Sequence, residues 1–196
     1  MNTINPIVFN TIFIYSFLYN PNIPNAPHSM KCFILSITEL INNPFLYKYI
    51  SEHPIPVNSR NSLFNWSYEL GKSFNFIKTD YSVFYKYYEN MDKNKTTWSH
   101  PTWLLIHYLA FINENKWTPE TKKSYKAFIS CLQFLLPCEI CRSHLNENLS
   151  KDNIDKYMKS GKLFEWSVNL HNIVNKMLNK PIIDKNTALI LLKQNI

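Results

Sequence analysis

The chain has 196 residues, of which 45% are apolar and 15% aromatic, a composition typical of a folded globular protein and not of a disordered chain. Its formal net charge is +7, but the basic residues are spread along the chain, so we expect no nucleic-acid partner. Only two glycines, Gly71 and Gly161, are present, which excludes the glycine-rich loops that cradle phosphates in P-loop and dinucleotide-binding folds.

The first predicted element is a buried helix over residues 7–19. This stretch, IVFNTIFIYSFLY, is apolar but too short to span a bilayer. No basic segment precedes it and no small-residue cleavage site follows it. We therefore expect neither a transmembrane helix nor a signal peptide.

Two stretches of the sequence resemble each other. LFNWSYELGKSFN at residues 63–75 and LFEWSVNLHNIVN at residues 163–175 share Leu, Phe, Trp, Ser, Leu and Asn at matching places. The similarity indicates either an internal duplication or two amphipathic helices of similar composition. Gly71 stands in the upstream stretch where His171 stands downstream, and no CxxC accompanies it. We interpret residues 1–95 as a helical domain that is a candidate degenerate copy of residues 96–196.

From residue 100 onward apolar residues recur at spacings of three and four, which predicts helices, whereas the alternation typical of strands is scarce. One helix begins near Pro101. The next follows Thr118, which can cap it, and runs to about Leu135. Pro137 ends that helix because its ring removes a backbone donor, and a third helix restarts at residues 138–139.

The remaining elements complete a small bundle. A short turn is expected near residues 151–159, and a long helix over residues 162–178 follows it. Asp184 can cap a last short helix over residues 187–193. The predicted fold class is all-α: a four-helix bundle plus a short fifth helix. The apolar stripe of the long helix is formed by Leu163, Trp166, Leu170, Val174 and Met177 or Leu178.

The cysteines carry the strongest chemical signal. Cys138 and Cys141 form a CxxC directly after Pro137, where a helix N-terminus would lower a thiol pKa. The pair could be redox-active, could form part of a zinc site with Cys131 and His144, or could be two core residues. Zinc would need ligands on both sides of the helix break, and thioredoxin-like chemistry would need a βαβ setting that this sequence does not offer.

Two pairs of side chains indicate a flat aromatic cofactor between helices. Trp103 and His107 are four residues apart and share a helix face, as do His171 and Asn175, with Asn172 beside them. Each of these residues alone is more often a core or surface residue than a ligand. Together with a CxxC they favour a redox cofactor held by side chains.

The segments PTWLLIH, LLPCEIC and WSVNLHNIVNKMLNKP resemble the Erv/ALR family of FAD-linked sulfhydryl oxidases. The resemblance covers about residues 98–183 and is to a minimal member of the kind that large DNA viruses carry. It implies a compact helical bundle that holds FAD, with a redox disulfide against the flavin ring. It also favours a viral location, in the virion or the host cytoplasm.

The resemblance assigns roles to residues of this chain. Cys138 would exchange with the substrate, and the Cys141 thiolate would contact the flavin. The positions that would bind FAD are His100, Trp103, His107, Leu136, His171, Asn172, Val174, Asn175 and Lys180.

The implied reaction is the oxidation of a protein dithiol to a disulfide, with electrons passing through the CxxC to FAD and then to O2, which gives H2O2. A thioredoxin-like protein is one candidate substrate. The family's pairing as dimers suggests an internal pseudo-dimer or a homodimer. We expect Cys32 and Cys131 to be buried thiols and not a second redox pair.

Two alternatives to an oxidase stay open at the level of the sequence. One is a helical interaction or structural protein that has kept the fold without the activity. The other is a zinc-stabilised helical module, which would be colourless and would contain metal.

Overall fold

The computed structural model describes residues 4–92 and 97–196. Within these two ranges it contains eleven helices and no strand, which confirms the predicted all-α fold class. None of the helices in the described ranges is both long and apolar enough to cross a membrane. The predicted boundary between residues 95 and 96 lies outside the described residues.

The first half of the chain contains α1 to α5. In α1 a proline follows an asparagine cap, and the Asn5 side chain accepts a hydrogen bond from the Ile7 N–H at 2.8 Å. This helix is buried on nearly all sides, as predicted for residues 7–19, because α4 and α6 pack against it. The bounds are α1 (Pro6–Leu18), α2 (Ala26–Ile41), α3 (Pro44–Glu52), α4 (Arg60–Ser73) and α5 (Tyr81–Asp92).

The second half contains the predicted bundle. Thr118 caps α7 in a reciprocal capping box with Thr121, and Asp184 caps the last helix. The bounds are α6 (Ser99–Asn113), α7 (Pro119–Leu135), α8 (Glu139–Lys151), α9 (Ile154–Ser160), α10 (Leu163–Met177) and α11 (Lys185–Lys193).

Three details of the prediction for this half are wrong. The expected turn near residues 151–159 contains α9, which Asn153 caps and which Gly161 ends at a left-handed φ of 65°. The last helix begins two residues earlier than predicted, because Asp184 accepts from the Asn186 and Thr187 N–H groups. The end of the apolar stripe on α10 is exposed, since Met177 and Leu178 lie where the helix leaves the bundle.

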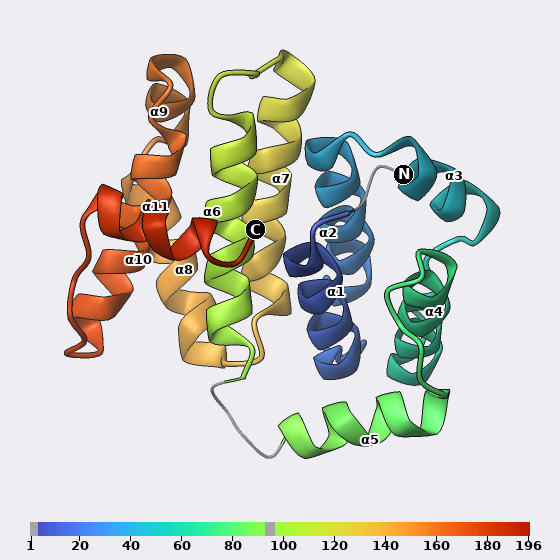
Figure 1. Cartoon of the computed structure of the whole chain (residues 1–196). Helices are drawn as coiled ribbons and strands as arrows, with labels where there is room; N and C mark the ends of the chain where they lie inside the picture. The colour runs from blue at the N-terminus through green and yellow to red at the C-terminus, as the bar shows by residue number, and fades with distance from the viewer. Residues whose placement is uncertain (1–3, 93–96) are drawn as a thin grey trace.

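The two halves lie side by side (Figure 1). Helices α6, α7, α8 and α10 form the bundle, and α11 lies across α6. Helix α2 packs along α7, and α1 packs against both α6 and α4. Helices α3 and α4 lie on the far side of α1 and α2 from the bundle. Helices α1 and α2 belong to the first half and pack directly against α6 and α7 of the second half, so they form the join between the halves.

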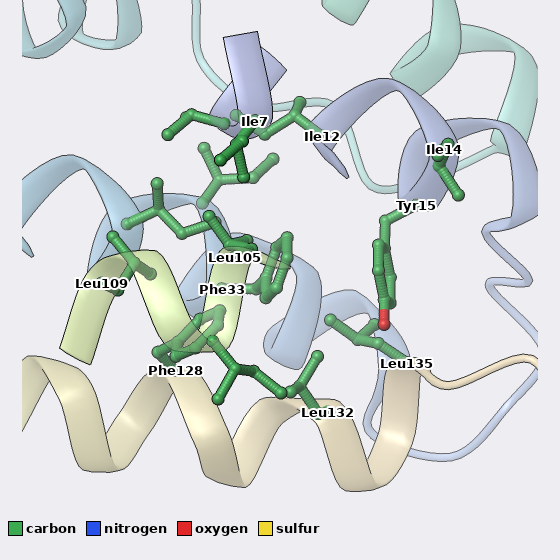
Figure 2. Packing of buried hydrophobic residues seen from close by; sticks show 14 of the residues in the cluster. Ile7, Ile12, Ile14, Tyr15, Phe33, Leu105, Leu109, Phe128, Leu132 and Leu135 are labelled. Carbon is green, nitrogen blue, oxygen red and sulfur yellow. The ribbon is translucent and has the colours of Figure 1, made fainter. Parts of the chain in front are cut away.

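One hydrophobic core runs through this join. Figure 2 shows Phe33 of α2 and Phe128 of α7 next to each other, and their ring centroids are 5.6 Å apart in a stacked arrangement. Polar side chains also form hydrogen bonds across the join. The Tyr15 and Thr102 hydroxyl oxygens are 2.9 Å apart, and the Asn113 amide donates to the Leu40 carbonyl at 3.1 Å. The two halves therefore share one buried core and are not separate domains joined only by a linker.

Helices α4 and α10, which carry the repeated sequence, bury matching positions. Ser67 donates its hydroxyl hydrogen to the Phe64 carbonyl at 2.7 Å, and Ser167 donates to the Phe164 carbonyl at 2.7 Å. The two serines thus make the same hydrogen bond within their helices. The matching buried pairs are Leu63 and Leu163, Phe64 and Phe164, Trp66 and Trp166, Ser67 and Ser167, and Leu70 and Leu170.

Candidate functional site

The predicted site residues gather at one end of the bundle. Helix α10 runs antiparallel to α6, because Trp103 lies beside His171 while Phe111 lies beside Phe164. Helix α7 follows α6 through a short connection and runs back along it. The start of α6, the end of α10 and the turn between α7 and α8 therefore share one end, as Figure 1 shows.

The turn between α7 and α8 carries a disulfide between Cys138 and Cys141, whose Cα atoms are 5.1 Å apart. Cys138 is the N-cap of α8, and its sulfur accepts a hydrogen bond from the Cys141 N–H at 3.2 Å. The Arg142 guanidinium donates to the Leu136 carbonyl at 2.7 Å, which holds the turn against the helix. The position after Pro137 was predicted, and the helix begins at Glu139.

The disulfide can be reached from outside. Both cysteines are half-buried, and Ile140 between them is 66% exposed. An N–H group at a helix start stabilises negative charge on the sulfur it contacts. Thiol–disulfide exchange releases such a charge, so the arrangement suits a disulfide that is opened and closed by thiols.

Trp103, His107 and His171 form an aromatic wall between α6 and α10. The Trp103 and His171 rings are parallel, with an interplanar angle of 6° and centroids 4.1 Å apart. The His107 ring lies 5.3 Å from that of His171 and is almost fully buried.

Both histidines of the aromatic wall are uncharged at neutral pH. Burial lowers the pKa of His107 to about 3, and the neighbouring His171 adds to the shift. Burial also lowers the pKa of His171 to about 4, helped by the charges of His100 and Lys180. His100 lies at the start of α6 and Lys180 just after the end of α10, and both side chains are exposed.

A residue that the prediction missed completes the contacts of the wall. The Ser167 hydroxyl lies 2.8 Å from Nδ1 of His107, and Nε2 of His107 lies 3.1 Å from Nδ1 of His171. Ser167 is fully buried on α10, one turn before His171. The signal in the sequence was the serine shared by the two repeated stretches, but a lone serine inside a helix does not by itself indicate a site.

The other predicted cofactor contacts are placed unequally. Asn172 uses both ends of its amide on Ile183, donating to the carbonyl at 2.7 Å and accepting from the N–H at 3.0 Å, which ties α10 to the chain before α11. Asn175 is buried, and its carbonyl accepts from the Lys180 N–H at 2.8 Å. Leu136 is buried and Val174 half-buried. The cofactor-binding roles of these residues stay predictions.

The donor set fits a flat ring cofactor such as FAD. The aromatic wall offers a rigid stacking surface, and its imidazoles are neutral, so a ring system meets no buried charge there. Lys180 carries an exposed ammonium suited to a phosphate. The disulfide lies at the same end of the bundle.

The zinc alternative finds no support in the described ranges. They contain no group of three or more His, Cys, Asp or Glu side chains that could hold a metal ion. Cys138 and Cys141 are bonded to each other, and Cys131 is buried in α7. Burial raises the pKa of Cys131, and the adjacent Cys32 thiol on α2 raises it further. Cys32 itself is half-buried, so only Cys131 is the fully buried thiol that was predicted.

Comparison of the sequence with known proteins finds the Erv1/Alr family and FAD-linked sulfhydryl oxidases. The sequence profile of the Erv1/Alr family matches residues 100–194. A FAD-linked sulfhydryl oxidase of African swine fever virus is 36% identical over 90 residues, which are 44% of this chain and 71% of that protein. The FAD-linked sulfhydryl oxidase ERV1 of Oryza sativa is 30% identical over 81 residues, which are 41% of each chain.

A third relative, protein 096R of Invertebrate iridescent virus 3, is 29% identical over 92 residues, which are 46% of this chain and 62% of that protein. The chain thus spans less than two thirds of the iridescent virus and rice proteins. The alignments cover less than half of this chain. No solved structure matches it.

Proposed function

The chain belongs to the Erv1/Alr family, and we propose that it is a FAD-dependent sulfhydryl oxidase that forms disulfides in protein dithiols. The observation that carries the proposal is the half-exposed Cys138–Cys141 disulfide at the same end of the bundle as the aromatic wall. FAD, when bound, would supply a two-electron acceptor that O2 can reoxidise with formation of H2O2.

The chain's own part begins with exchange. A substrate thiolate attacks Cys138, the Cys138–Cys141 bond breaks, and Cys141 leaves as a thiolate. A second substrate thiol, as its thiolate, then attacks the substrate sulfur of the mixed disulfide and releases Cys138 as a thiolate. The Cys141 N–H contacts the Cys138 sulfur at 3.2 Å and stabilises the negative charge that Cys138 gains. The substrate leaves as a disulfide, and its two electrons remain on Cys138 and Cys141.

The roles of the binding residues follow from their positions. Trp103 and His171 would face the ring system of the cofactor, and His107 would hold His171 in place. Asn175 and Lys180 lie at the end of α10, where a diphosphate could meet the Lys180 ammonium. The exposed Ile140 supports an apolar contact with the substrate, for which a thioredoxin-like dithiol protein is a candidate.

We further propose that the first half is a degenerate copy of the second, so that the chain is an internal pseudo-dimer. Helices α1 to α5 can be paired in chain order with α6, α7, α8, α10 and α11 if α9 is left without a counterpart. Gly71 stands where His171 stands, and a Cβ there would lie 2.5 Å from Ile77 and 2.8 Å from Phe13. Side chains of the first half thus fill the place of that histidine, which supports a single cofactor site per chain.

Cysteine variants test the oxidase. Cys138→Ser and Cys141→Ser should each abolish oxygen consumption with a dithiol substrate while retaining bound FAD, because they remove the exchanging sulfurs and leave the aromatic wall intact. Cys32→Ser and Cys131→Ser are the matched controls and should keep full activity. Equal activity of all four variants would show that the CxxC does not carry the electrons.

A further inference from the structure

His107 lies between Ser167 and His171, and its two contacts determine which ring nitrogen of His171 carries the hydrogen. Its Nδ1 faces the Ser167 hydroxyl at 2.8 Å, and its Nε2 faces Nδ1 of His171 at 3.1 Å. A neutral imidazole has one N–H donor and one bare acceptor nitrogen. Ser167, His107 and His171 form a row of hydrogen bonds, and donors and acceptors must therefore alternate along this row.

The direction of the row is set by the serine. Ser167 gives its only hydroxyl hydrogen to the Phe164 carbonyl at 2.7 Å, three residues earlier on the same helix. Ser67 makes the same bond to Phe64 at 2.7 Å in α4, so the bond does not depend on a neighbouring histidine. The Ser167 oxygen is then left as an acceptor, and Nδ1 of His107 must carry the hydrogen that it receives.

The remaining assignments follow in order. With its hydrogen on Nδ1, His107 presents a bare Nε2, so Nδ1 of His171 must donate to it. The hydrogen of His171 is thereby fixed on Nδ1, and its Nε2 carries a lone pair. Trp103 fixes the plane of the ring, because it stacks on His171 at 4.1 Å and 6°. Both the orientation and the tautomer of His171 are thus determined by neighbours.

We propose that Ser167 is a positioning residue that acts through His107 to hold His171 as the Nδ1–H tautomer, which offers the Nε2 lone pair to an O–H or N–H donor of FAD. The inference rests on the proposed function for the identity of the cofactor, and on the chain's own contacts for the tautomer. Burial, which lowers the pKa of both histidines, is consistent with neutral rings.

The first half of the chain shows what the serine does without the histidines. Ser67 keeps the bond to the helix carbonyl and is as fully buried as Ser167. Gly71 occupies the position of His171 there, so the row has no end point in α4. Ser67 therefore provides a matched control for the purely structural part of the serine's role.

The test is a long-range 1H–15N spectrum of the purified full chain with 15N-labelled histidine near neutral pH. We expect His107 and His171 both as Nδ1–H tautomers. Ser167→Ala should turn His171 into a mixture of tautomers and weaken FAD binding about fivefold, the scale of one lost hydrogen bond. Ser67→Ala should change neither the tautomer nor the affinity.

Three other results would each test one part of the proposal: the tautomer, the role of Ser167 or the cofactor. An Nε2–H signal for His171 in the parent chain would overturn the proposal, because the row would then run the opposite way. An unchanged tautomer in Ser167→Ala would overturn the role of Ser167. If the chain binds no FAD, but His171 is the Nδ1–H tautomer in the parent and a mixture in Ser167→Ala, the proposed function is contradicted and the part assigned to Ser167 is supported.

Discussion

His107 and His171 are polar residues that the fold keeps neutral. His107 is 5% exposed and has hydrogen-bond partners at both ring nitrogens, so its burial leaves no unsatisfied group. His171 is half-buried and is covered by Trp103 on one face. Their neutrality has a consequence for stability at low pH.

The free energy of unfolding should fall as the pH falls from about 6.5 toward 4. The pKa values in the folded chain are about 3 for His107 and about 4 for His171, below the ordinary value of 6.5. The unfolded chain therefore binds more protons in this window, and each histidine contributes a slope of up to about 1.4 kcal/mol per pH unit. An NMR titration checks the cause: neither imidazole should titrate above about pH 5, and a midpoint near 6.5 for either would contradict it.

Cys131 should resist alkylation in the folded chain. Its thiol is buried, and burial together with the adjacent Cys32 raises its pKa, so little thiolate forms at pH 8. Labelling by iodoacetamide, followed by peptide mass spectrometry, should be at least about tenfold slower for Cys131 in the native chain than in urea. Equal rates in the two conditions would show that the thiol is open to solvent.

At the scale of elements, the sequence predicted those helices whose ends carry a local signal. Thr118 with Pro119, Pro137 and Asp184 mark starts and stops through capping or a missing donor, and the structure confirms them. Helix α9 was missed because its seven residues are too few to show a periodic pattern. The exposed end of α10 was missed because periodicity tells which face is apolar, not how far the bundle covers it.

Gly71 of α4 stands at the position that His171 occupies in the repeated stretch of α10. A Cβ there would lie 2.5 Å from Ile77 and 2.8 Å from Phe13, both of which are buried. Gly71→Ala should therefore destabilise the chain by about 1–3 kcal/mol through overpacking, despite the helix propensity of alanine. Glu69→Ala, on the exposed face of the same helix, is the control. Urea denaturation measures both, and a stabilised Gly71→Ala would show that the space is open.

The whole molecule should unfold as one unit, because the two halves share one hydrophobic core. Phe33 lies in α2 and stacks on Phe128 of α7, and both rings are fully buried. Phe33→Ala should cost about 3–5 kcal/mol and leave a single unfolding transition. Phe45→Ala, at a side chain that is 57% exposed, should cost less than about 0.5 kcal/mol. Two separate transitions in calorimetry would show that the halves are independent.

The sequence could not predict this join. The repeated stretch indicated two related segments, but the residues that connect the halves, such as Phe33 and Phe128, are apolar side chains with no partner-specific pattern. The site was predictable to the extent that its chemistry needs rare residues, namely two cysteines, two histidines and a tryptophan. Ser167 could not be assigned, since its part depends on a contact with another helix.

The proposed function needs a flavin bound at the aromatic wall, and the FAD content of the purified full chain shows whether one is there. The chain should carry the visible absorption of an oxidised flavin, and denaturation should release one FAD per chain, because the place of His171 is filled in the first half. A colourless chain that takes up no FAD when the cofactor is added would show that the aromatic wall holds no flavin and that the chain is not a FAD-dependent oxidase.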